Sequence, residues 1–328
     1  MELKRRVVVV GLGSIGRRHA RLLLARKDIQ VELVEPNIET LAIAQNELGN
    51  LPSYTTFEGM LKARPDIVFI ATPHELHSSQ VIQSLYAGAH VFCEKPMSNS
   101  LSGAIKMKEA AESSRRVLNI GFQLHFHPGL LMLKKLIEQG ILGSILYVSA
   151  KVGTYVTLVN SVSHYQSAQE GALFYDYTHL PDVLFWLLKK KPKAVYSLAM
   201  CGGSLEFLSN PNVAVITCEY DIPLITSIHL NYVQMPQRHE YEIIGDKGWA
   251  VLDGDKGILN TGIRENSSTQ IESFSVDRDD IFRAEHKMFF QAVENKREPE
   301  SPPKDGLVSM EVCDAAIRSW KTMSRVLV

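Results

Sequence analysis

The chain has 328 residues, which is enough for about two domains. Its 45% hydrophobic and 22% charged residues are ordinary for a globular protein. The formal net charge of −1 provides no overall field to hold a polyanion, so we expect no nucleic-acid partner. No apolar run reaches the roughly 18 residues of a membrane span, so we expect no membrane partner. The four cysteines lack metal-like spacing, which favours reduced thiols in a cytoplasmic protein.

The first 35 residues carry the strongest local pattern. The β-branched run Val7 to Val10 predicts a strand, and it leads directly into Gly11-Leu12-Gly13-Ser14-Ile15-Gly16. A helical stretch, Arg17 to Ala25, and a second strand, Val31 to Val34, follow. The first glycine permits a tight turn, the second lets the backbone approach a pyrophosphate, and the third allows close helix packing. This order predicts a dinucleotide-binding unit, with the helix N-terminus facing the phosphates.

The second strand ends at Glu35, 19 positions after Gly16. An acid at this place can accept both ribose hydroxyls of NAD, whereas it would repel the 2′-phosphate of NADP. The next residues, Pro36, Asn37 and Ile38, are not basic. The sequence therefore favours NAD as the cofactor, with NADP as the less favoured alternative.

Strands and helices alternate through the rest of the first third of the chain, which predicts a doubly wound parallel sheet with helices on both faces. The expected helices are 39–48, 57–62, 75–87 and 100–113, and the expected strands are 66–71, 90–93 and 117–120.

The pattern changes near Gly121. After a helix at 129–139, short alternating segments predict an antiparallel meander rather than βαβ units. The expected strands are 144–152, 194–200, 214–221, 224–232, 240–244 and 249–252, and the expected helices are 171–188, 280–295 and 307–325. We therefore predict two domains: 1–121, which binds NAD(P) in a Rossmann fold, and 122–328, a substrate-binding α+β domain with an open, mostly antiparallel sheet.

These motifs resemble one family along almost the whole chain: the glucose–fructose oxidoreductase, inositol dehydrogenase and rhizopine-catabolism (Gfo/Idh/MocA) family. The matching segments are Gly11 to Gly16, Ala71-Thr72-Pro73 with His77, Ala87-Gly88, Glu94-Lys95-Pro96, and Asp176 with His179 and Asp182. The resemblance implies an NAD(P)-dependent oxidoreductase whose second domain carries an open sheet that commonly forms homodimers or homotetramers. An uncovered sheet face would also favour such an assembly.

Lys95 directly follows a predicted strand, which places it at the carboxyl edge of the parallel sheet, where doubly wound folds bind ligands. Alcohol oxidation needs a base for the hydroxyl proton and a positive group near the developing alkoxide. A lysine can serve in either role. The resemblance also implies a cis peptide bond before Pro96, and cofactor contacts from Glu94 and Lys95. The alternative is a solvent-facing lysine before a turn.

Asp176 and His179 are three residues apart, so one continuous helix would place them on one face. His179 can take up a proton near neutral pH, and Asp176 can orient it or contact a substrate hydroxyl. The resemblance gives such an acid and histidine these roles, although its commoner spacing is four. Pro181 should break or restart the helix near Tyr177. A capping histidine and a solvated acid are the alternative.

Two further segments supply candidate contacts. The resemblance assigns Thr72, Pro73, His74 and His77 to the loop over the cofactor, with His74 where an asparagine is usual.

Gln123 and His125 lie at the predicted entry to the second domain and are expected to contact substrate. The polar segment around Tyr155, His164 and Tyr165 could cap the cleft or be plain surface. We predict no metal site, because neither His74 with His77 nor His125 with His127 has a third ligand at suitable spacing.

The sequence therefore predicts an NAD-dependent dehydrogenase of a sugar, amino sugar, nucleotide-sugar or cyclic polyol, with Lys95 and His179 handling the hydroxyl proton. Two alternatives stay open: an NAD-dependent glycosidase that acts through transient oxidation, and a non-catalytic NAD-binding regulator.

Overall fold

The computed structural model describes residues 4–160 and 165–328. The chain forms two compact units: Met1–Gln123 with Arg278–Leu307, and Leu124–Asp277 with Val308–Val328. We call them the first unit and the second unit. The predicted break at 121/122 lies beside the end of the first segment. The domain division predicted from sequence differs from these units in one respect: it assigns residues 278–307 to the second domain, whereas the structure places them in the first unit.

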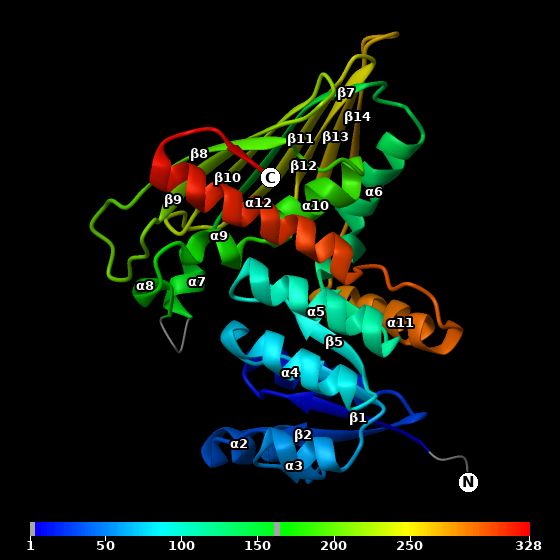
Figure 1. Ribbon diagram of the computed structural model, residues 1–328. Helices are drawn as coiled ribbons and strands as arrows, with labels where there is room; N and C mark the ends of the chain where they lie inside the picture. Colours follow the sequence, from blue (N-terminus) through cyan, green and yellow to red (C-terminus); the bar gives the residue numbers. More distant parts are fainter. Residues whose placement is uncertain (1–3, 161–164) are drawn as a thin grey trace. The chain divides into compact units, whose positions relative to one another are not determined.

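The first unit contains a six-stranded parallel sheet in the order β3-β2-β1-β4-β5-β6 (Figure 1). This order reverses between β1 and β4, as in dinucleotide-binding folds, and such a reversal opens a crevice at the carboxyl ends of the strands. The strands are β1 (Arg5–Val10), β2 (Ile29–Val34), β3 (Ser53–Tyr54), β4 (Ile67–Ile70), β5 (His90–Glu94) and β6 (Leu118–Gly121). The helices are α1 (Ser14–Leu23), α2 (Ile38–Leu48), α3 (Phe57–Lys62), α4 (His74–Tyr86), α5 (Leu101–Ser114) and α11 (Arg278–Asn295).

The late helix α11 belongs to the first unit because its aromatic side chains complete the core of the parallel sheet. Phe289 is fully buried and packs edge-on against Phe69 of β4 and Phe92 of β5, with ring centroids 5.6 Å from each. The same core includes Ala20 and Leu23 of α1. A segment that is distant in sequence thus covers one face of the sheet beside α1, which explains the difference from the sequence division.

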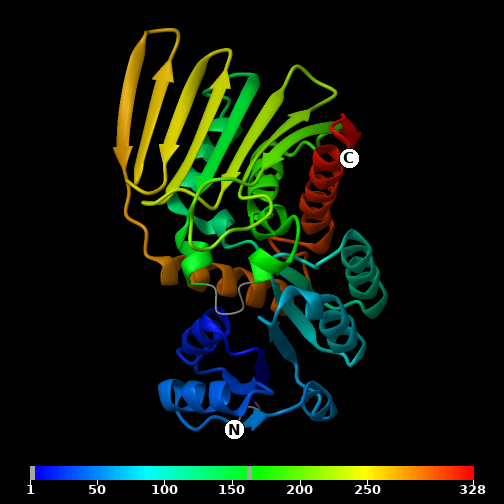
Figure 2. The ribbon, with the colours of Figure 1, turned by 90° about the vertical axis from the view of Figure 1, so that its left-hand side faces the viewer.

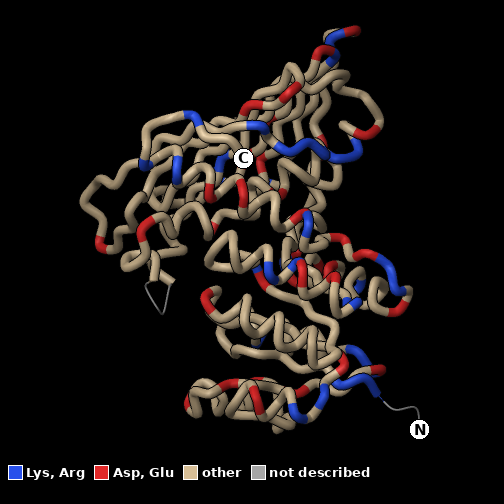
Figure 3. The backbone as a smooth tube through the Cα atoms, viewed as in Figure 1, with Lys and Arg blue, Asp and Glu red and all other residues tan. Residues whose placement is uncertain are grey.

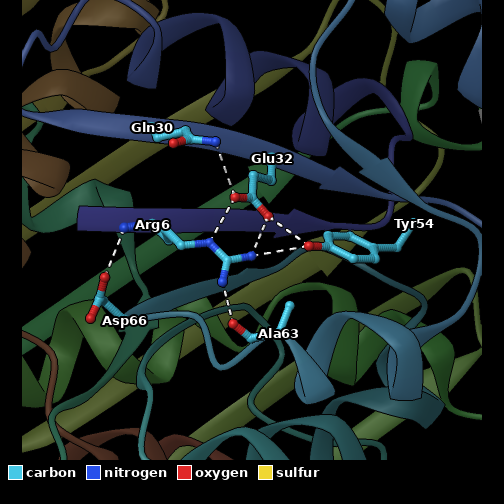
Figure 4. A network of polar contacts seen from close by, with 6 residues as sticks. All are labelled: Arg6, Gln30, Glu32, Tyr54, Ala63 and Asp66. Carbon is cyan, nitrogen blue, oxygen red and sulfur yellow. Dashed lines mark hydrogen bonds and ion pairs between the residues drawn. The ribbon is translucent and has the colours of Figure 1, made fainter. Parts of the chain in front are cut away.

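A partly buried polar network lies in the same sheet (Figure 4). Arg6 of β1 donates two hydrogen bonds, both 2.8 Å long, to the carboxylate of Glu32 in β2, and a third from Nη1 to the carbonyl of Ala63. The Tyr54 hydroxyl donates to the same carboxylate at 3.1 Å. Because Glu32 is only 2% exposed, these partners compensate a buried negative charge.

The second unit contains a nine-stranded mixed sheet in the order β14-β13-β12-β11-β7-β10-β9-β8-β15 (Figure 2). The strands are β7 (Ile145–Gly153), β8 (Ala194–Met200), β9 (Val213–Glu219), β10 (Ile225–Asn231), β11 (Arg238–Gly245), β12 (Gly248–Asp253), β13 (Ile258–Ile263), β14 (Ser268–Ser273) and β15 (Val326–Leu327). The sheet is mostly antiparallel, as predicted. A parallel pair, between β7 and β10, lies at its centre, and the predicted meander of antiparallel strands did not include it.

Helices α6 (Pro128–Glu138), α10 (His179–Leu188) and α12 (Pro303–Thr322) lie along one face of this sheet (Figure 1). Their apolar side chains and the inward residues of the strands form one core. Burial alternates along β9, as expected for a strand with one buried face. The shorter elements are η1 (Gln123–Phe126), α7 (Val156–Val159), α8 (Tyr165–Ala168) and α9 (Ala172–Asp176).

Lys and Arg residues are interspersed with Asp and Glu over both units (Figure 3). None of the described helices is both long and apolar enough to cross a membrane.

Candidate active site

The glycine loop connects β1 to α1 and has the geometry that its sequence predicts. Gly11 has φ +84°, and a Cβ there would lie 2.8 Å from the carbonyl oxygen of Ala71. A Cβ on Gly16 would lie only 1.8 Å from the carbonyl oxygen of Gly11, so this position excludes any side chain. Gly13 differs, because a Cβ there would meet no atom within 4 Å. Packing therefore does not require glycine at position 13, and close approach of a ligand does.

Gly13 is also the N-cap residue of α1, and no side chain caps this end of the helix. The first amide groups of the helix, beginning at Ser14 and Ile15, therefore stay available to a ligand, and the helix dipole favours a negative one. An uncapped helix end behind a glycine with open space fits a dinucleotide pyrophosphate. Arg17 also stabilises the loop, since its Nη1 donates to the carbonyl oxygen of Leu12 at 2.8 Å.

Glu35 lies at the end of β2 and reaches back to the glycine loop. Its Oε2 accepts the backbone N–H of Leu12 at 2.9 Å, and its Oε1 accepts the N–H of Asn37 at 3.0 Å. These two bonds fix the carboxylate beside the loop that would hold the cofactor. Asn37 is occupied as the N-cap of α2, where its side chain accepts the N–H of Thr40 at 2.9 Å. The segment that follows Glu35 thus offers a carboxylate and no cation, which fits NAD better than NADP.

The loop after β4 is tied to the loop after β5 by His77. The ring nitrogens of His77 lie 2.9 Å from the carbonyl oxygen of Thr72 and 2.9 Å from that of Pro96. Burial lowers the pKa of His77, although its contacts with the two carbonyls oppose this. Pro73 is the N-cap residue of α4 and His74 its first residue, which is buried. His77 therefore holds both loops at the carboxyl edge of the sheet.

Lys95 follows the last residue of β5, at the same sheet edge as the glycine loop. The bond between Lys95 and Pro96 is cis, as the family resemblance implied. The backbone N–H of Lys95 donates to Oε2 of Glu94 at 3.3 Å, and Oε1 of Glu94 lies 2.8 Å from Nε2 of His19. Both carboxylate oxygens of Glu94, a predicted cofactor contact, thus have protein partners. His19 lies three residues after Gly16 on α1, and its role was missed because nothing near it in sequence indicates a buried polar partner.

Asp176 and His179 of the second unit lie on different helices. Asp176 is the last residue of α9, and His179 is the first residue of α10. The expectation of one shared helix face was wrong, whereas the predicted interruption at Tyr177 is confirmed. Pro181, the third residue of α10, cannot donate to the carbonyl of Tyr177, so the helix restarts there.

Asp176 is buried and held by two residues that the sequence did not indicate. Its Oδ2 accepts the hydroxyl of Tyr232, from the end of β10, and Nε2 of Gln166 at 3.2 Å. Burial, with the charge of Asp176 next in effect, holds the pKa of Tyr232 well above its usual range, so the phenol stays a donor. The Tyr177 ring lies between this group and His179, with centroids 5.6 Å from Tyr232 and 5.5 Å from His179.

The predicted contacts Gln123 and His125 lie in η1. Nε2 of His125 is 2.8 Å from Oδ2 of Asp182, and both side chains are 1% exposed. The imidazole also stacks on Trp186, with centroids 4.7 Å apart and planes 10° apart. The His125 side chain thus faces the interior of the second unit. Tyr155 accepts the N–H of Phe207 at 3.1 Å, and Tyr165 begins α8, while His164 lies outside the described residues.

The fold and the glycine loop define a dinucleotide-binding protein with a second, sheet-based unit. Residues 5–122 match an oxidoreductase family model described as an NAD-binding Rossmann fold, and residues 134–328 match that family's C-terminal alpha/beta domain. The chain belongs to this Gfo/Idh/MocA oxidoreductase family, and the resemblance seen in its motifs is confirmed. It is an NAD-binding oxidoreductase.

Individual relatives align with almost the whole chain. The inositol 2-dehydrogenase of Salmonella typhimurium is 24% identical, with 96% of this chain and 94% of that protein covered. The inositol 2-dehydrogenase/D-chiro-inositol 3-dehydrogenase of Shouchella clausii is 27% identical, with 97% and 92% covered. Among solved structures, levoglucosan dehydrogenase in complex with NADH and levoglucosan has a TM-score of 0.86 at 18% identity, covering 99% of this chain and 100% of that one.

Proposed function

We propose that this protein is an NAD-dependent dehydrogenase that oxidises a CH–OH group of a cyclic polyol or sugar. The observation that carries the proposal is that Lys95 and the glycine loop lie at the same edge of the parallel sheet. Lys95 follows β5, which ends at Glu94, and the glycine loop follows β1, which ends at Val10; only β4 separates these two strands. A ligand held by the loop would lie at the sheet edge where Lys95 follows β5, as ligands do in doubly wound folds.

NAD, when bound, accepts the hydride from the substrate carbon. The chain itself must take the hydroxyl proton and stabilise the negative charge that develops on the oxygen. Lys95 is the proposed cation for that oxygen. His179 is the proposed proton acceptor, because an imidazole changes its protonation near neutral pH. The contacts predicted for Glu35 and the 72–77 loop belong to the same proposal.

Asp176 is proposed to contact substrate or orient His179. Its burial with Tyr232 and Gln166 supports a fixed position, since a buried carboxylate persists only with hydrogen-bond partners. Gln123 remains a proposed substrate contact. The bond from His125 to Asp182 favours a supporting role for His125 at the start of α6 over a direct contact.

Cyclic polyols are proposed as the first substrates to test because the relatives aligned over the whole chain are named as inositol dehydrogenases. The test is a screen of inositols, sugars, sugar acids and nucleotide-sugars, with NAD and NADP in parallel, that follows the absorbance of reduced cofactor. Net accumulation of NADH with at least one polyol or sugar is expected. Cleavage of a glycoside without net NADH would instead identify the glycosidase alternative.

We also propose that the chain forms a homodimer or homotetramer through the uncovered face of the nine-stranded sheet. Large apolar side chains on its strands are exposed, among them Leu198 (59%), Met200 (61%) and Ile271 (72%). Exposed apolar side chains gathered on one face are characteristic of an interface. Light scattering should show an oligomer that Leu198→Glu with Met200→Glu reduces in size. Ile43→Glu on α2, at an equally exposed apolar position (55%), is the matched control and should leave the mass unchanged.

A further inference from the structure

A chain of buried hydrogen bonds lies directly behind Lys95 in the first unit. The backbone N–H of Lys95 donates to Oε2 of Glu94, and Oε1 of Glu94 is 2.8 Å from Nε2 of His19. Nδ1 of His19 is in turn 2.7 Å from Nε2 of His286 on α11. Glu94, His19 and His286 are 7%, 1% and 4% exposed. Three titratable side chains from three elements therefore share one enclosed network.

Aromatic rings enclose much of this network, while Arg278 and His77 interact electrostatically with Glu94, and Arg26 with His286. The His19 ring touches Phe69, Phe92 and Phe282, with centroid distances between 5.2 and 5.5 Å. A Cβ on Gly121 would lie 3.0 Å from Oε1 of Glu94, so the carboxylate fills the space beside this glycine. In such surroundings a hydrogen bond is strong and its loss is costly. The position of the carboxylate therefore depends on its hydrogen bond with His19.

The direction of each hydrogen bond follows from its acceptor. A carboxylate can only accept, so Nε2 of His19 carries the proton that points to Glu94, and Nδ1 is then free to accept. Burial holds the pKa of His286 well below its usual range, so this ring is neutral and donates its N–H from Nε2 to His19. His286 of α11 thus donates to His19 of α1, and His19 donates to Glu94, the residue before Lys95.

We propose that His19 is a positioning residue for the reaction. It holds the Glu94 carboxylate, and through Glu94 the backbone of Lys95, in a fixed relation to helix α1. The N-terminus of helix α1 is the predicted pyrophosphate site. His19 lies on the same helix, three residues after Gly16. The cofactor helix and the proposed catalytic lysine are thereby joined by two hydrogen bonds. His286 fixes the orientation of the His19 ring. This inference rests on the proposed function, since it assigns a role relative to Lys95.

Three variants test the proposal. His19→Leu fills much of the space but removes both hydrogen bonds, whereas His19→Gln keeps a side-chain N–H for Glu94 and cannot act as an imidazole. His90→Gln is the matched control: His90 begins the same strand at its far end, where its Nδ1 accepts the N–H of Val117 at 3.0 Å. Each is assayed for kcat, KM and pH dependence with NAD and the polyol of highest turnover, and for NAD affinity by calorimetry.

His19→Leu is expected to lower kcat on the order of 10- to 100-fold, the cost of a reacting group displaced by about an ångström. NAD affinity should change little, because the glycine loop is intact. His19→Gln should stay within about fivefold of the native kcat, because its amide N–H can still donate to Glu94. His90→Gln should show native kinetics.

Two results would overturn the proposal: a folded His19→Leu enzyme with native kcat, or a His19→Gln enzyme as impaired as His19→Leu, which would point to proton transfer by the ring. If His19→Leu does not fold, His286→Leu removes only the outer bond and should lower kcat by less, with NAD affinity unchanged. A Lys95→Ala enzyme with full activity would refute the proposed function itself. Inactive Lys95→Ala beside unaffected His19 variants would refute only this inference.

Discussion

The parallel sheet of the first unit contains two polar networks that differ in charge and in place. Arg6, Glu32 and Tyr54 pair a full positive charge with a full negative one, within strands β1, β2 and β3. His19 and His286 instead hold Glu94, the residue before Lys95, at the carboxyl edge where the glycine loop lies. In the first network the positive charge of Arg6 compensates the negative charge of Glu32. The second network ends at the backbone of Lys95, the proposed catalytic residue. Changes to the first should therefore alter stability, and changes beside the second should alter turnover.

Replacement of Lys95 should give the largest effect on turnover. Lys95→Ala removes the proposed cation and proton-handling group and should lower kcat about a thousandfold. The free energy of unfolding should change by less than about 1 kcal/mol, because the side chain is half-buried and not part of the core. Steady-state kinetics and urea unfolding measure the two quantities. Lys106→Ala, on α5 of the same unit, is the control and should match the native enzyme in both; native turnover by Lys95→Ala would remove the catalytic assignment.

Tyr232→Phe should give the next largest effect on turnover. The variant removes the hydroxyl that donates to Asp176 and leaves the ring in place. We expect kcat or kcat/KM to fall about tenfold, because the carboxylate loses one of its hydrogen-bond donors. Tyr220→Phe removes another buried hydroxyl of the second unit, 3.2 Å from Thr226, and serves as the control. Equal kinetics for the two variants would contradict a functional role for the Asp176 group.

Arg6→Met tests the stability side of the comparison. It leaves the Glu32 carboxylate buried without its cation, which should cost about 3 kcal/mol of unfolding free energy. Arg21→Met is the control, since Arg21 pairs with Asp279 at an exposed position (45%) and should cost less than about 1 kcal/mol. The kcat per folded molecule should be native in both. A fall in kcat for folded Arg6→Met would show that the two networks are not separate in function.

The smallest expected effect is on how the free energy of unfolding depends on pH in the acidic range. The Arg6 guanidinium holds the pKa of Glu32 below its usual range, although burial opposes this. A lowered folded-state pKa adds stability that is present above the unfolded value and is lost as pH falls through the folded value. Native protein should therefore exceed Glu32→Gln in unfolding free energy at neutral pH, and the gap should narrow below about pH 4.3. A gap independent of pH would show that charge is not what stabilises this network.

Most elements of the first unit, although not the two-residue strand β3, could be predicted from sequence because their signals are local. The glycine loop, the strand ends before Glu35 and Lys95, and the helix stop at Gly88 each lie within a few residues of what they specify. Strand pairing in the second unit is not local. Strands β13 and β14 were missed, since the polar and glycine-containing residues of Ile258–Ile263 and Ser268–Ser273 gave little alternation.

The same distinction applies to the site residues. Lys95 and Asp176 were selected as candidates from sequence because each belongs to a short motif, and their roles stay predictions. Their partners could not be selected in this way, since His19 is 75 residues from Glu94 and Tyr232 is 56 residues from Asp176. A buried histidine on an apolar helix face has no sequence signal that separates a core position from a functional one. Only the fold brings such pairs together.

Calorimetric titration of the purified protein with NAD and with NADP tests the central claim most directly. The uncapped end of α1, the open space at Gly13 and the carboxylate of Glu35 predict one NAD bound per chain, with weaker or no binding of NADP. Failure to bind either cofactor, or tighter binding of NADP, would contradict the account.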